Sequence, residues 1–213
     1  MIWEVILEYN NSSPARIYVM EPKRPIQLTD HSFWAFIRNH PDDLFVVFTS
    51  QQRRFLWDSD RAIREFLAFR YHIKPHQAFS HTALVWWEDD KPMMYHQTTP
   101  KYKRNQWGTR AKNVAFWVED EKVVSIAKKR ARSFYKHNRH YSYGQLITLI
   151  LTELSFGLIP VPIREGMVCS EAVARELSFY DGSSERFYNE VDPYSLYLNI
   201  KARGYREFNV SKD

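Results

Sequence analysis

The chain contains a single cysteine, Cys169, whose surroundings favour a reactive thiol. It follows a loop broken by Pro160 and Pro162, and the residues after it have a helical pattern up to about residue 178. The thiol therefore lies at a helix start, where unpaired N–H groups and the helix dipole stabilise a thiolate. Such N–H groups can also form an oxyanion hole. The alternative is a structural thiol, because Cys169 shares an apolar helix face with Val173.

A nucleophilic cysteine needs a base from another element, and His81 is the strongest candidate among eight histidines. It opens the β-rich run 81–87, directly after Ser80. A second run, 93–98, contains His96, and the Glu-Asp-Asp-Lys turn between the runs predicts a hairpin. In such a hairpin His96 comes near His81. Most of the other histidines fall in loops or among charged residues, which is typical of solvated side chains.

The elements around these residues alternate between helical and strand patterns, which predicts one α+β domain over residues 1–213. Neither an internal repeat nor a long linker divides the chain. The expected strands are 3–9, 17–20, 44–48, 81–87, 93–98, 114–119 and 205–210. The expected helices are 29–39, 59–70, 120–136, 143–156, 169–178 and 193–203.

Four short motifs, taken in order, resemble the circularly permuted branch of the NlpC/P60 papain-like hydrolases, which includes the YiiX-like proteins. A histidine that precedes the cysteine along the chain is the permuted order. The resemblance covers roughly residues 40–180, and Asp replaces a Gly in the first motif while Ser replaces an Asp in the third. The motifs are the run 42–48, Ser80-His81, Tyr141-Ser142-Tyr143 and Cys169-Ser170-Glu171.

The resemblance implies a permuted papain-like fold, in which an antiparallel sheet packs against helices that include the nucleophile helix. An N-terminal hairpin and helix and a C-terminal helix and strand would decorate the core of residues 40–180. The family's third polar residue is expected at His96, with Glu88 as the alternative. Tyr141, Tyr143 and Ser170 are expected to line the site or assist the oxyanion. The alternative for the two tyrosines is packing at a helix entry.

The function that follows is a cysteine hydrolase of the peptidase or amidase type, which cleaves an amide or ester through an acyl-enzyme. The resemblance allows peptide, peptidoglycan-like and lipid acyl substrates, hydrolysis or acyl transfer, and also an inactive member that only recognises its ligand. No cofactor is expected. A single cysteine nearly excludes a cysteine-based zinc site, and no metal is predicted.

The alternative to a hydrolase is a protein of a different class, one that binds nucleic acid or another polyanion. The formal net charge is +5 and the isoelectric point is near 9.2. Exposed aromatic residues near basic ones could stack on bases, and we expect Tyr102 and Trp107 in this role. A solvated helix face is the simpler reading of the basic residues. The expected polyanion contacts on helix 120–136 are Lys128, Lys129, Arg132 and Lys136.

The N-terminus lacks the basic start and long apolar run of a signal peptide. No stretch approaches the roughly 18 apolar residues that cross a bilayer. We therefore expect a soluble, cytoplasmic protein without a transmembrane segment. A phage or bacterial protein that is delivered by another route fits the same features.

Overall fold

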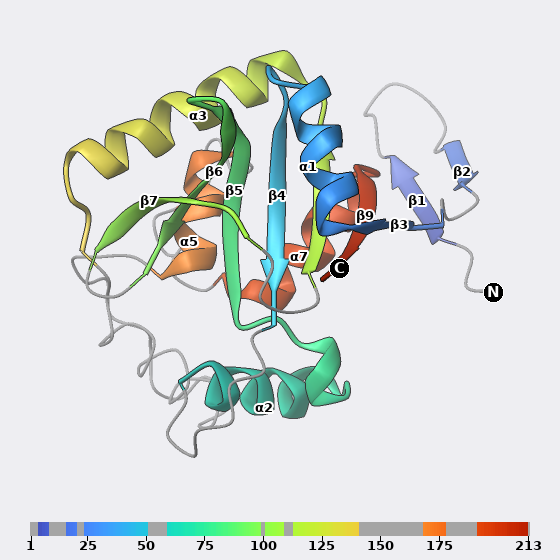
Figure 1. Ribbon diagram of the computed structural model, residues 1–213. Helices are drawn as coiled ribbons and strands as arrows, with labels where there is room; N and C mark the ends of the chain where they lie inside the picture. The colour runs from blue at the N-terminus through green and yellow to red at the C-terminus, as the bar shows by residue number, and fades with distance from the viewer. Residues whose placement is uncertain are drawn as a thin grey trace.

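The computed structural model describes residues 4–8, 16–20, 24–50, 59–98, 101–108, 113–140, 168–177 and 191–212. In this part of the chain the fold is α+β, as predicted, with five α-helices and a seven-stranded sheet (Figure 1). The predicted N-terminal hairpin is confirmed as a separate two-stranded antiparallel sheet of β1 (Glu4–Glu8) and β2 (Arg16–Met20).

The main sheet has the strand order β3-β9-β8-β4-β5-β6-β7. The β3–β9 pair is parallel, and the other neighbours are antiparallel. β3 and β9 lie outside residues 40–180, so the sheet extends beyond the segment that carries the family resemblance. The strands are β3 (Ile26–Thr29), β4 (Leu44–Thr49), β5 (His81–Glu88), β6 (Lys91–Gln97), β7 (Tyr102–Gln106), β8 (Asn113–Val118) and β9 (Arg206–Ser211).

The helices begin where short polar side chains cap them. Thr29, Asp120 and Asp192 each accept hydrogen bonds from N–H groups of the helix that follows. The helix predicted over 143–156 lies outside the described residues. The described helices are α1 (Asp30–Asn39), α2 (Ser59–Tyr71), α3 (Glu121–Lys136), α5 (Cys169–Glu176) and α7 (Pro193–Ala202), with a short 3₁₀ turn, η1 (Pro75–Gln77).

Helices cover both faces of the main sheet, and each face has its own apolar core (Figure 1). α1 packs on one face, and α3, α5 and α7 pack on the other. Successive side chains of β4 alternate between the two cores: Phe45 and Val47 join the α1 core, while Val46 and Phe48 join the other. Burial on both faces explains why β4 is an uninterrupted apolar run.

Candidate active site

The thiol of Cys169 lies at the start of α5, as the sequence predicts, and the residue is 5% exposed. The N-cap residue is Val168, whose side chain makes no capping hydrogen bond. The first N–H groups of a helix have no acceptor within the helix. N–H groups at a helix start are the kind of donor that stabilises a thiolate or a developing oxyanion.

His81 and His96 form a hydrogen-bonded pair. β5 and β6 pair as the predicted hairpin, with Leu84 opposite Tyr95. This register makes His81 and His96 diagonal neighbours on one face of the sheet. The His81 Nε2 and His96 Nδ1 atoms lie 2.8 Å apart, and the two rings are nearly perpendicular at 77°. The predicted proximity of His96 to His81 is therefore confirmed.

Asn105 extends this pair into a relay of three side chains across β5, β6 and β7. Its Nδ2 lies 3.2 Å from His96 Nε2, on the side of the ring away from His81. The register of β6 and β7 pairs His96 with Lys103, which places Asn105 on the same face as His96. Sequence reasoning missed Asn105 because β7 was not predicted. Apart from Tyr102 the residues of β7 are all polar, so the sequence offered no alternation that could have revealed it.

Burial lowers the pKa of both histidines. The pKa of His81 falls from its ordinary value near 6.5 to about 4. The pKa of His96 also falls well below its ordinary value, mainly through burial and then through the charges of His81 and Lys103. Both imidazoles are therefore neutral at neutral pH, and each has one N–H donor and one lone pair.

Cys169 and His81 lie at the same end of the main sheet. Ser170, next to the thiol, donates its hydroxyl hydrogen bond to the Val191 carbonyl at 2.5 Å. The neighbouring Asp192 accepts a hydrogen bond from Tyr71 at the end of α2, which leads into β5. Figure 1 shows α2 below the end of the sheet where β5 begins. α5 packs against β5 and β6.

The thiol and the imidazole nevertheless approach this end from opposite faces. Side chains alternate along β5, so His81 shares a face with Val85, which packs in the α1 core. Val173 of α5 packs in the other core with Leu84. Within the described residues the hydrogen bond of His81 goes to His96 and not to Cys169. His81 pairs with Thr49, the last residue of β4, so it lies at the rim where the two faces meet.

The other expected site residues have different surroundings. The Ser170 hydroxyl is committed to Val191, which leaves its backbone N–H as the group that can act in an oxyanion hole. Glu88 ends β5 at the opposite end from His81, so the structure does not bring it to the relay. Tyr141 and Tyr143 lie outside the described residues.

Glu88 is instead the centre of a polar cluster that ties α3 to the sheet. It accepts hydrogen bonds from Tyr95 at 2.6 Å, from Arg104 at 3.1 Å and from Arg132 at 2.8 Å. These three donors lower the pKa of the Glu88 carboxyl below its ordinary value, against the opposing effect of burial. The cluster accounts for Glu88 as a structural residue.

The expected polyanion surface is partly used inside the molecule. Arg132 forms an ion pair with Glu88, and Lys128 donates to the Asp42 carbonyl at 2.8 Å. Lys129 and Lys136 remain exposed on α3. Two of the four expected basic contacts thus have partners within the chain, which weakens the polyanion reading.

The expectation that Tyr102 and Trp107 are exposed stacking residues is wrong. Tyr102 is 1% exposed and Trp107 is 2% exposed. Tyr102 donates a buried hydrogen bond to Glu176 of α5, and Trp107 packs edge-on against Phe33 of α1. Their place next to lysines and arginines suggested the surface, but Tyr102 packs in the core with α3 and α5, and Trp107 packs in the α1 core on the other face of the sheet.

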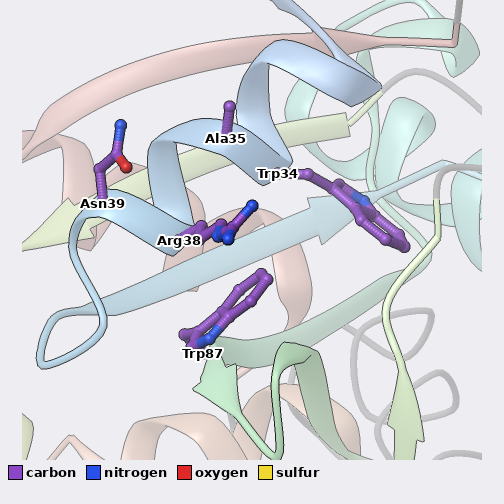
Figure 2. A pocket seen from close by; sticks show the side chains of 5 residues that line it. All are labelled: Trp34, Ala35, Arg38, Asn39 and Trp87. Carbon is purple, nitrogen blue, oxygen red and sulfur yellow. The ribbon is translucent and has the colours of Figure 1, made fainter.

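A pocket of about 450 Å³ lies on the α1 side, between α1 and the end of β5. Figure 2 shows Trp34, Arg38 and Trp87 around it, together with Ala35 and Asn39. Trp87 is on the same strand as His81, but about 20 Å further along it at the usual rise per residue. The pocket is therefore separate from the relay.

The chain matches no protein-family model and no curated protein. Among the described helices, none combines the length and apolar character that a bilayer crossing requires. In the same part of the chain, no group of three or more histidine, cysteine, aspartate or glutamate residues could hold a metal ion.

Proposed function

We propose that the protein is a cysteine hydrolase, in which Cys169 attacks an amide or ester carbonyl and His81 acts as its base. The observation that supports this most is the 2.8 Å hydrogen bond between His81 and His96, because a base on a rigid strand needs a partner that orients its ring. A pKa near 4 keeps His81 neutral at neutral pH, so it can accept a proton.

The proposed reaction runs through an acyl-enzyme. The Cys169 thiol gives its proton to His81, and the sulfur forms a bond to the carbonyl carbon while the carbonyl electron pair moves to oxygen. N–H groups at the start of α5 stabilise this oxyanion. When the intermediate collapses, the leaving amine or alcohol takes the proton from His81. Water then attacks the thioester with His81 as base, which releases the acid and restores the thiol.

This reaction requires the thiol and the imidazole to meet at the rim of the sheet. His81 occupies the last row of β4–β5 pairs, and Cys169 is the first residue of α5 at the same end. The proposal therefore requires a rearrangement that brings these two side chains together around the end of β5. The pairing of Cys169 with His81 is therefore the part of the proposal that most needs an experimental test.

The substrate class remains the one that the family resemblance implies: a peptide, a peptidoglycan-like peptide or a lipid acyl group. The permuted NlpC/P60 papain-like fold is likewise part of the proposal, beyond the α+β class. We expect the protein to act in the cytoplasm, where a single thiol stays reduced.

Acetylation by p-nitrophenyl acetate tests the proposed chemistry without the natural substrate. We expect mass spectrometry to find an acetyl group on Cys169 and none in Cys169→Ser. Loss of the base in His81→Ala should slow acetylation by about 10²–10⁴-fold. The matched control is His137→Ala, which removes an exposed histidine at the end of α3. Acetylation of Cys169 at an equal rate in His81→Ala would contradict the proposal.

A further inference from the structure

The hydrogen bonds that join His81, His96 and Asn105 can run in either of two directions, according to which atom of each pair is the donor. Neutral imidazole donates from one nitrogen and accepts at the other. A hydrogen bond between two neutral rings can therefore hold its proton in only two ways, and the partner at the far end of the relay selects between them. That partner is Asn105, 3.2 Å from His96 Nε2.

The amide orientation in the structure defines one of these two states. Asn105 presents Nδ2, a donor, so His96 Nε2 must accept. The proton of His96 then lies on Nδ1 and is donated to His81 Nε2. His81 is left with its own proton on Nδ1. In this state the nitrogen of His81 that faces away from His96 is a donor and cannot take a proton from a thiol.

Turning the amide by 180° reverses every step. Oδ1 then accepts a proton from His96 Nε2, His96 Nδ1 accepts from His81 Nε2, and the lone pair of His81 moves to Nδ1. The two amide orientations fill nearly the same volume, and Asn105 is exposed at the edge strand β7, so the turn displaces no packed neighbour.

We infer that Asn105 is a positioning residue whose amide orientation sets the proton direction of the relay and thereby switches His81 between a donor and a base. The inference rests on the proposed function for its role in catalysis, but the proton direction itself is a property of the three side chains. Because Asn105 is exposed, both amide orientations are accessible without substrate, and a substrate carbonyl that accepts from Nδ2 would raise the fraction of molecules in which His81 is a base.

Nitrogen-15 NMR of the histidine side chains tests this inference without any substrate. Two-bond correlations between ring protons and ring nitrogens distinguish the two neutral tautomers. In the unsubstituted protein at about pH 8.5, where both rings are neutral, we expect protons on Nδ1 of His81 and of His96. In Asn105→Asp, whose carboxylate can only accept, we expect both protons on Nε2.

The matched control is Asn39→Asp, which adds the same charge at an exposed position on α1. It should leave both tautomers unchanged. If Asn105→Asp leaves the two rings in the tautomers of the unsubstituted protein, the inference is overturned. The acetylation test fails or succeeds separately: tautomers that switch without acetylation of Cys169 would support the relay and refute the proposed hydrolase.

Discussion

His81 is held neutral in the folded protein, because burial lowers its pKa to about 4. Between this value and the ordinary value of about 6.5, the unfolded chain binds a proton that the folded chain excludes. The contribution of neutral His81 to the free energy of unfolding is therefore fully present above about pH 6.5 and is lost as the pH falls toward 4. His96 acts in the same direction, since its pKa is lowered as well.

We expect the free energy of unfolding, measured with urea, to fall by about 1–3 kcal/mol more in the unsubstituted protein than in His81→Gln between pH 7 and pH 4. The difference between the two proteins removes the contribution of the carboxylates to the pH dependence, because both proteins have the same carboxylates. Equal pH dependence in the two proteins would show that His81 is not held neutral by the fold.

At the scale of single residues, the sequence predicted the proximity of His81 and His96, because a tight turn between two β-rich runs leaves few possible registers. Asn105 could not be predicted in the same way. Its role depends on a third strand, β7, whose residues after Tyr102 are all polar, so the apolar alternation that predicts a strand is absent.

At the scale of elements, α5 is fastened to β7 by a buried hydrogen bond from Tyr102 to Glu176 at 2.5 Å. Glu176 is fully buried, and burial raises its pKa well above the ordinary value, against the smaller effect of the Tyr102 hydrogen bond. The folded protein therefore holds this carboxyl protonated at a pH where the unfolded chain has released the proton. Ionisation then favours unfolding as the pH rises.

The neutral variant Glu176→Gln removes this penalty and should be more stable than the unsubstituted protein above about pH 4.5. The difference should widen by up to about 1.4 kcal/mol per pH unit until the folded carboxyl ionises. Thermal and urea unfolding across pH 5 to 8 would measure it. Glu121→Gln, at an exposed site in the first turn of α3, is the control and should show no such widening.

The sequence predicted the ends of a helix correctly where capping residues were present. Asp192 with Pro193 predicted the start of α7, and Gly204, with a φ of 74°, lies just past its end as expected. The short strand β3 was missed because its partner, β9, lies at the other end of the chain. The residues of a short segment give no signal of a partner strand that lies far away in the sequence.

At the scale of the whole molecule, two apolar cores share one sheet, and the face that α1 covers also carries the relay. Phe33 of α1 is fully buried in that core, against Phe45, Trp107 and Phe208. This packing anchors α1 over the sheet. Because side chains alternate along each strand, the order and register of the strands determine which side chains share this face. They can be read only from the structure.

Phe33→Ala should lower the free energy of unfolding by about 3–5 kcal/mol, because it opens a cavity in the α1 core. Phe69→Ala is the matched control, since Phe69 on α2 is 73% exposed, and it should change stability by less than about 0.5 kcal/mol. Urea unfolding would measure both. A similar effect of the two substitutions would contradict the burial of α1 against the sheet.

The pairing of Cys169 with His81 is the central claim, and the pH dependence of Cys169 alkylation by iodoacetamide tests it most directly. The midpoint of this dependence reports the pH at which the thiol can give up its proton during attack, whereas limited access to the buried sulfur changes only the rate. We predict a midpoint well below the value of about 8.5 for a free thiol, because neutral His81 takes the proton as the sulfur attacks, and a rise toward about 8.5 in His81→Ala. His137→Ala should leave it unchanged. Identical midpoints in the unsubstituted protein and His81→Ala would contradict the account.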